Sequence, residues 1–200
     1  MASTRTQTLN ETTLAQALWP QAGTATAMRA TVLAVLGIAL LTLSAKVQVP
    51  FYPVPMTMQS LVVLAIGAAY GSRLGGATVL AYLAAGAAGL PVFAGTPEKG
   101  IGLAYMMGPT GGYLLGFLAA AITAGWLAER GWDRSAGRLF AAMFIGHAVI
   151  FALGIAWLAP HLGWSKAWLV GVAPFYWATL LKTALATALL RGAWRWAARD

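Results

Sequence analysis

The chain contains no cysteine and carries very little charge. Its 200 residues include five acidic and 13 basic residues, so 9% are charged, whereas 60% are hydrophobic. The lack of cysteine excludes disulfides, thiolate metal sites and cysteine nucleophiles. Soluble domains are about 25% charged, and this chain has too few polar residues to cover a surface in water. A membrane protein is therefore the expected class.

Acidic residues and catalytic motifs are also missing from the apolar parts of the chain. All five acids lie outside the long apolar stretches, and the sequence has no GxxxxGK[ST], HExxH or GxSxG motif. His147 stands alone in such a stretch, where we expect a hydrogen bond between helices rather than a metal ion. We predict that the protein is not an enzyme, holds no cofactor or metal, and does not itself bind ATP through a phosphate loop.

Long apolar stretches dominate what is present. About 20 apolar residues cross the hydrocarbon core of a bilayer, and such stretches follow one another from residue 28 onward. They predict an all-α integral membrane protein, a bundle of six helices in the lipid bilayer, with a short amphipathic piece at 166–172. We divide the chain into a polar cytoplasmic tail at 1–27, without a secretory signal peptide, and a membrane domain at 28–200. The predicted helices are 28–46, 57–72, 74–90, 109–129, 138–159 and 174–196.

Basic residues are distributed unevenly between the two sides of this predicted bundle. Nine arginines lie at one set of helix ends, whereas Lys46, Lys99 and Lys166 lie at the other. Because Lys and Arg accumulate in cytoplasmic loops, both termini are predicted to be cytoplasmic in a multi-pass protein of the bacterial cytoplasmic membrane. Topology then accounts for the net charge of +8, and no nucleic-acid partner is expected.

Two segments rich in proline and glycine interrupt the apolar stretches, at 49–59 (VPFYPVPMTMQ) and 89–113. In lipid, irregular backbone is tolerated only where it is buried in protein or lines a cavity. The charge pattern places both segments on the outer side. We therefore expect them to build a solute site there, although a mobile outer loop is the simpler alternative for the second segment.

Lys182 is the one formal charge deep inside a predicted span, about 12 Å from the start of its helix at Pro174. A cation at this depth needs an anionic partner, and no acid in the spans can serve. A bound carboxylate is the candidate partner, and the alternative is a lysine that extends to the membrane interface.

Other candidate binding groups lie in or beside the two irregular segments. The Gln59 amide can both donate and accept hydrogen bonds, which suits a urea- or amide-like solute, and packing against a neighbouring helix is equally open. Phe93 and Tyr113 offer apolar ring faces. The glycine-rich backbone of 95–102, which includes Gly100, offers polar groups.

Small residues recur at every fourth position in three predicted helices, which lets helix backbones approach closely. In the third and fourth helices we interpret them as packing within the bundle, and in the first helix as a face that docks a second membrane protein. They are Ala77, Ala81, Ala85 and Gly89 in the third helix, Gly112, Gly116, Ala120 and Ala124 in the fourth, and Ala30 and Ala34 in the first.

Three motifs, PVPMTMQ (53–59), GLPVFAG (89–95) and GPTGGYLLGF (108–117), resemble in order and spacing those of the BioY family. That family comprises the biotin-specific substrate-binding subunits (S components) of energy-coupling factor (ECF) transporters. The resemblance implies six helices and a biotin pocket near the outer face, closed by the loops after the first and third helices. It also implies partners, namely a membrane coupling subunit and a pair of ATPases. The coupling subunit contacts an AxxxA pattern that Ala30 and Ala34 match.

The resemblance also suggests roles for individual residues. Lys182 corresponds to a lysine of a PF-x-x-x-D-x-x-K pattern near the biotin carboxylate, and Thr179 stands where the family often has the acid. The ureido ring is expected on Gln59 and the 95–102 backbone with Gly100. Phe93 and Tyr113 are expected to contact the thiophene ring and valeryl chain. Some members carry an arginine where this chain has Leu114.

Several alternatives remain at this point. The chain could be an S component for another vitamin such as riboflavin or thiamine, or a stand-alone biotin carrier that needs no ATPase. An intramembrane enzyme is disfavoured by the lack of paired acids, cysteine and metal-ligand spacings. A purely structural membrane protein would not need two stiff outer segments poor in charge.

Overall fold

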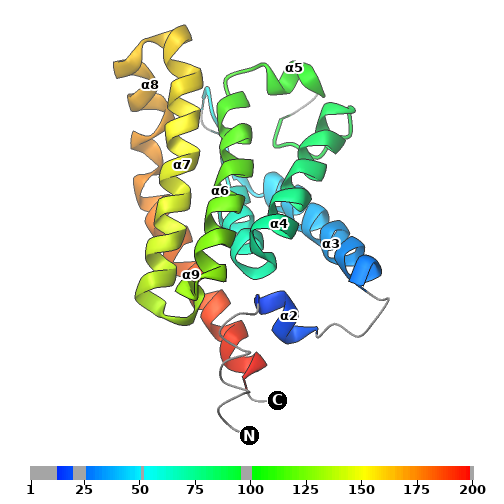
Figure 1. The fold of residues 1–200 in the computed structure, drawn as a ribbon. Helices are drawn as coiled ribbons and strands as arrows, with labels where there is room; N and C mark the ends of the chain where they lie inside the picture. Colours follow the sequence, from blue (N-terminus) through cyan, green and yellow to red (C-terminus); the bar gives the residue numbers. More distant parts are fainter. Residues whose placement is uncertain (1–12, 20–25, 51, 96–100, 199–200) are drawn as a thin grey trace, which may run out of the picture.

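Helices form almost all of this protein in a computed structural model that describes residues 13–19, 26–50, 52–95 and 101–198 (Figure 1). An antiparallel pairing joins β1 to β2, with Gln48 opposite Thr57. Two 3-10 turns, η3 and η4, precede α7 and α9. In chain order the elements are α2 (Leu14–Leu18), α3 (Thr26–Lys46), β1 (Gln48–Val49), β2 (Met56–Thr57), α4 (Gln59–Ala87), α5 (Leu103–Met106), α6 (Gly111–Glu129), η3 (Trp132–Arg134), α7 (Ala136–Leu162), α8 (Trp164–Gly171), η4 (Ala173–Phe175) and α9 (Tyr176–Ala197).

Five segments of the described chain are long and apolar enough to cross a membrane, which agrees with the predicted class of helical membrane protein. The predicted count was six. The difference arises at α4, which is continuous over the two predicted helices 57–72 and 74–90. The other four segments are α3, α6, α7 and the stretch from α8 through α9.

The α4 helix is bent sharply at Gly71, which adopts φ 86° and ψ 172°. Residues with side chains rarely adopt this conformation, and a Cβ here would also meet the Glu129 carboxylate. A Cβ on Gly75 would lie 3.0 Å from the Cα of Gly67. In a straight helix these residues would be about 12 Å apart along the axis. The two arms of α4 therefore fold back on each other, and the break predicted at residue 73 lies at Gly71.

Glu129, at the C-terminal end of α6, holds this bend. The Ser72 backbone N–H donates to Glu129 Oε1 at 2.7 Å, and the Ser72 hydroxyl donates to the same carboxylate at 2.9 and 3.0 Å. The second arm begins here with unpaired backbone N–H groups and the positive end of its dipole, which a carboxylate stabilises. The bend is thus fixed to α6.

The core lies between α4, α6 and α7, where glycines allow close backbone contact. A Cβ on Gly67 would meet the Ala121 backbone, and one on Gly116 would meet the Ile150 backbone. Ala120 and Ala124 are fully buried. The prediction that the small residues of the fourth predicted helix pack within the bundle is therefore confirmed.

The same prediction is wrong for the third predicted helix. Ala77 and Ala81 in the second arm of α4 are exposed. The buried face of this arm carries Thr78, Val79 and Tyr82 instead. The larger side chains therefore face the core, and the predicted ladder is exposed at Ala77 and Ala81 and half-buried at Ala85 and Gly89.

The first helical element, α2, belongs to the segment predicted as a polar tail. Thr13 and Gln16 form a reciprocal capping box at its start. Leu14 is buried, and α2 packs against α4 and α9. This part of the 1–27 segment therefore lies on the bundle surface.

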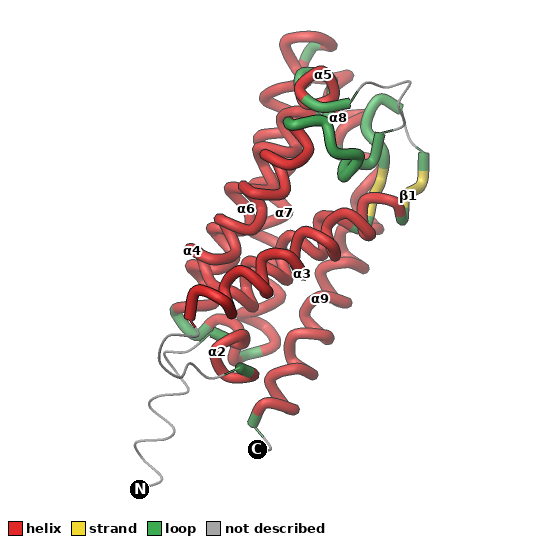
Figure 2. The backbone as a smooth tube through the Cα atoms, turned by 90° about the vertical axis from the view of Figure 1, so that its right-hand side faces the viewer, coloured by secondary structure: helices red, strands yellow, loops and turns green. Residues whose placement is uncertain are grey.

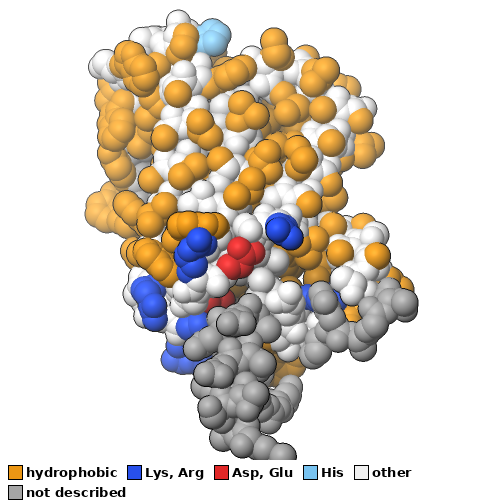
Figure 3. Space-filling view, in the orientation of Figure 1, with side chains coloured by type: hydrophobic (Ala, Val, Ile, Leu, Met, Phe, Trp, Pro, Cys, Tyr) orange, Lys and Arg blue, Asp and Glu red, His pale blue; other side chains and the backbone are white. Residues whose placement is uncertain are grey.

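The two ends of the bundle differ in chemistry. The α4 bend, α2 and the C-terminal end of α9 lie at one end, whereas α5 and the α7–α8 turn lie at the other (Figure 1). On the face seen in Figure 3, Lys, Arg, Asp and Glu side chains gather near the first end, and hydrophobic side chains cover most of the remainder. Figure 2 shows α3 along the outside of the bundle, where it packs mainly on α4.

Two helical glycines with different surroundings, one at the contact between α4 and α6 and one in open space on α9, predict opposite effects of a Gly→Ala change. Gly67→Ala forces α4 away from Ala121 and should destabilise the fold by about 1–3 kcal/mol. Gly192→Ala, in the α9 interior with open space around it, should stabilise it by up to about 1 kcal/mol through helix propensity. Thermal unfolding of both variants in the same detergent checks this, and a similar shift for both would contradict the packing argument.

Candidate functional site

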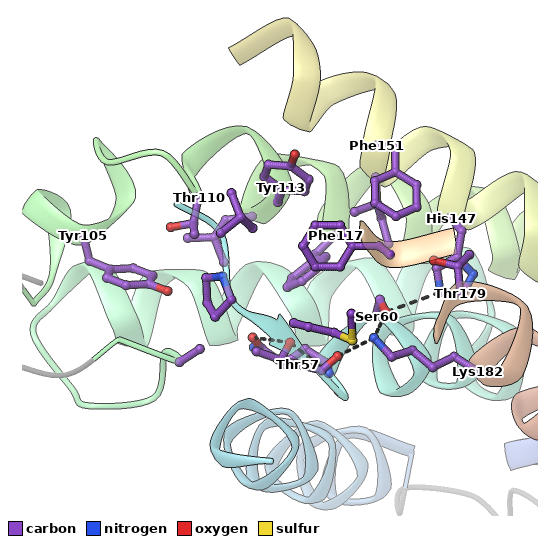
Figure 4. Close-up of a pocket in the computed structure, with 18 residues that line it drawn as sticks. Thr57, Ser60, Tyr105, Thr110, Tyr113, Phe117, His147, Phe151, Thr179 and Lys182 are labelled. Carbon is purple, nitrogen blue, oxygen red and sulfur yellow. Dashed lines mark hydrogen bonds between the residues drawn. The ribbon is translucent and has the colours of Figure 1, made fainter. Parts of the chain in front are cut away.

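A cavity lies between the β1–β2 hairpin, α4, α6, α7 and α9, and it reaches α5 (Figure 4). Small-molecule sites are typically concave and largely apolar, with a few polar groups that orient the ligand. Aromatic rings supply much of the wall, and polar side chains gather near β2 and α9. The rings belong to Tyr105, Tyr113, Phe117, Phe151 and Phe175.

Lys182 extends from α9 into the polar part of this cavity. Its Nζ donates to the Thr57 carbonyl at 2.6 Å and lies 3.5 Å from the Ser60 hydroxyl (Figure 4). Within the described ranges no acidic side chain lines the cavity, and the one ion pair there joins Arg134 to Asp133. The ammonium group is thus bonded to neutral oxygens only. Because a desolvated cation favours a nearby anion, this part of the cavity suits a carboxylate.

His147 connects three helices beside Lys182. One ring nitrogen, Nε2, lies 3.3 Å from Ser60 Oγ on α4, and the other, Nδ1, lies 3.2 Å from Thr183 Oγ1 on α9 and 3.1 Å from the Met143 carbonyl. This confirms the interpretation of His147 as a residue that hydrogen-bonds between helices. No cluster of three potential metal ligands occurs in the part of the chain that the structure describes.

Gln59 lines the cavity and also bonds to the second arm of α4. Its Nε2 donates to the Tyr82 hydroxyl at 2.6 Å, and that hydroxyl donates to the Val92 carbonyl at 2.9 Å. Gln59 Oε1 accepts a long bond of 3.4 Å from the Thr57 hydroxyl. The amide retains a second N–H and a further lone pair that a solute can use. The two interpretations of Gln59, solute contact and helix packing, are thus compatible.

Tyr113 and Thr179 also line the cavity. The Tyr113 hydroxyl donates to the Gly171 carbonyl at 2.8 Å, which satisfies one of the free carbonyls at the end of α8. Thr179 is buried one helical turn before Lys182.

Phe93 does not line the cavity. Its ring stacks behind Tyr105, with centroids 5.2 Å apart, and meets Tyr82 edge-on at 5.5 Å. Phe93 therefore supports the wall that Tyr105 forms. Gly100 lies outside the described residues.

The model of the BioY family matches residues 12–199. The chain belongs to the BioY family. It is 37% identical over 157 residues to the "Probable biotin transporter BioY" of Pyrococcus horikoshii, covering 78% of this chain and 91% of that protein. It is 38% identical to the biotin transporter BioY of Thermotoga maritima, covering 76% and 87%.

A solved structure shares the fold. It is the S component for biotin from an ECF-type ABC transporter, with a TM-score of 0.74 and 22% identity, covering 88% of this chain and 95% of that one. The BioY membership suggested by the three sequence motifs is thus confirmed, and so is a fold of the S-component type.

Sequence reasoning missed several wall residues of this BioY protein. Phe151 follows His147 by four residues and Phe175 precedes Thr179 by four, so helical spacing could have placed both on the cavity side. Their rings meet at a centroid distance of 6.1 Å. Tyr105 lies in the second irregular segment, where no periodicity indicated which aromatic faces inward.

The bond between Tyr113 and Gly171 predicts a stability effect that is separate from cavity shape. Tyr113→Phe leaves the Gly171 carbonyl without its partner and should cost about 1–3 kcal/mol of stability. Tyr176→Phe is the control, because the Tyr176 side chain is 50% exposed. Loss of this exposed hydroxyl should change the stability by less than about 0.5 kcal/mol. Unfolding midpoints of both variants provide the measurement, and equal midpoints would show that the bond to Gly171 contributes nothing.

Proposed function

We propose that this protein binds biotin and mediates its uptake across the bacterial cytoplasmic membrane as the substrate-binding subunit of an ECF transporter. One observation carries the proposal. In a chain of the BioY family, the cavity combines a cation without an anionic partner among the described residues, Lys182, with an aromatic wall and a free amide edge. Biotin carries the complementary groups, a carboxylate, an apolar ring and chain, and a ureido group.

In the proposed complex the biotin carboxylate accepts from Lys182, and Thr179 lies one turn away. The thiophene ring and valeryl chain contact Tyr113 and the other rings of the wall. The ureido group bonds to Gln59 and to the backbone of the 95–102 segment. Thr57 is bonded to both polar residues, since its carbonyl accepts from Lys182 and its hydroxyl donates to Gln59. Both polar contacts therefore lie beside β2. An experiment must show which end of biotin, the carboxylate or the ureido group, bonds to Lys182.

Lys182→Ala is expected to weaken biotin binding by about tenfold or more, since a charge-assisted hydrogen bond contributes about 1.5–3 kcal/mol. Biotin methyl ester, which lacks the negative charge, should lose much less affinity. Lys166→Ala, which removes a lysine outside the cavity, is the control and should bind both ligands like the wild type. Ligand-dependent thermal shifts of the purified chain provide the measurement.

Equal losses for biotin and its methyl ester would remove Lys182 from the carboxylate role and place it at the ureido end. A shift of the wild type with riboflavin or thiamine, and none with biotin, would contradict the proposed substrate.

We propose six membrane crossings, with the two arms of α4 counted separately and both termini in the cytoplasm. The support is the bend at Gly71 and the arginine-rich set of helix ends. The end of the bundle with α2 and the C-terminal end of α9 then faces the cytoplasm, and the hairpin and α5 face outward.

We further propose that α3 contacts the membrane coupling subunit, which links the protein to its pair of ATPases. Only five residues of α3 are buried within this chain. Ala30 and Ala34 are half-buried and share a helix face with the buried Gly37 and Leu41. Along this face α3 is covered near its C-terminal end and partly open near its N-terminal end, where a partner helix can approach closely.

Ala34→Trp should leave biotin binding intact and abolish ATP-driven uptake, because an indole blocks close approach of the partner helix. The matched control is Val35→Trp, which places the same side chain at a position that is 60% exposed on another side of α3. Uptake of labelled biotin by cells with the coupling subunit and ATPases measures the effect. Wild-type uptake by the Ala34 variant, or equal loss in both variants, would contradict docking at this face.

A further inference from the structure

A second hollow lies far from the cavity, at the arginine-rich end of the bundle. It lies between η3 and the C-terminal end of α9. Figure 3 shows Lys and Arg gathered at this end of the molecule. The polar residues that line the hollow are Arg134, Arg191, Trp194 and Arg195.

Asp133 fixes the inner wall of this hollow. Asp133 is 2% exposed and accepts from Trp194 Nε1 at 2.8 Å and from Arg134 Nε at 3.3 Å. The Arg134 guanidinium also stacks over the Trp194 ring at 3.5 Å. Arg191 donates to the Arg134 carbonyl, so α9 is tied to η3. Arg134 and Arg191 are therefore held in place before any ligand arrives.

Among the described residues, positive charges outnumber negative charges around this hollow. Asp133 and Arg134 compensate each other, and none of the described residues that line the space is acidic. Within the described ranges, the positive charges of Arg191 and Arg195 have no acidic partner. Burial lowers the pKa of Arg134 and raises the pKa of Asp133, so the inner wall is poorly solvated. An anion in such a place is attracted more strongly than at an open surface.

One face of α9 joins exposed apolar residues to these arginines. Leu181, Ala184, Ala188, Arg191 and Arg195 follow one another at spacings of three and four residues, which puts them on one helical stripe. Leu181, Ala184 and Ala188 are exposed, and so is Arg195. These three residues form an exposed apolar strip along α9, and the strip ends at Arg191 and Arg195.

We propose that this hollow binds the phosphate of an anionic lipid headgroup, with Arg191 and Arg195 as its ligands and an acyl chain along the apolar strip of α9. Arginine forks match phosphate oxygens. Free phosphate has the same recognition chemistry, and the strip favours the lipid because an acyl chain can use it. The proposal does not depend on which solute the central cavity binds.

The test uses the purified full chain in a neutral detergent and native mass spectrometry. Phosphatidylglycerol and phosphatidylcholine with identical acyl chains are titrated separately. We expect the wild type to bind phosphatidylglycerol at least fivefold more tightly, and the double variant Arg191→Gln/Arg195→Gln to lose this preference. The charge-matched control, Arg73→Gln/Arg130→Gln, removes two exposed arginines that do not line the hollow and should keep it.

A second pair of changes guards against loss of the fold. Arg191→Lys/Arg195→Lys keeps both charges and should retain part of the preference, and the unfolding midpoints of all variants are compared. Competition with inorganic phosphate distinguishes the sources. Failure to displace phosphatidylglycerol at millimolar concentration supports the lipid, whereas displacement at micromolar concentration would assign the site to a soluble phosphate compound and overturn the lipid assignment.

Two other results would overturn the proposal altogether. One is an equal loss of preference in the control double variant, which would mean that total charge alone attracts the lipid. The other is unchanged lipid binding by Arg191→Gln/Arg195→Gln together with loss of its co-purification with the coupling complex, which would assign the surface to an acidic protein partner.

Discussion

One ammonium group, Lys182 Nζ, defines the polar part of the central cavity. It reaches from α9 to the Thr57 carbonyl on β2 and lies near Ser60 on α4. His147 bonds to the same serine and to Thr183, one residue after the lysine. The charge is thus held by neutral groups from two elements, β2 and α4, and His147 orients one of them, Ser60. A buried cation without a counter-charge is costly, and a ligand carboxylate would reduce this cost when it binds.

The features that could be predicted from sequence are those in which one residue differs from everything around it. Lys182 is the only charge within its apolar stretch, and helical spacing places Thr179 on the same side. Gln59 and Tyr113 are the last residues of the two irregular segments, which were expected to build a solute site. Phe93 could not be placed in this way. It comes from the same irregular segment as Tyr113, but its ring stacks behind that of Tyr105, which lines the cavity.

Helix faces were harder to assign because spacing fixes which residues share a face but not what that face meets. The alanines at 77 and 81 have the same period as those at 120 and 124, yet the first pair is exposed and the second buried. What decides between them is the bend at Gly71, which turns Val79 and Tyr82 toward the core. The bend in turn depends on Glu129, a residue 58 positions later in the chain. Local pattern carries no information about such a contact.

The α9 helix shows how one span can serve two environments. Thr179, Lys182 and Thr183 face inward to the cavity and His147, whereas Leu181, Ala184 and Ala188 face outward. Both faces belong to a single rigid rod that is tied to η3 through Arg191 and Trp194. A shift of α9 that follows rearrangement around Lys182 must therefore also move the arginines at its end. A lipid phosphate held by Arg191 and Arg195 would resist that shift, so the surrounding membrane would bear directly on the geometry of the solute site.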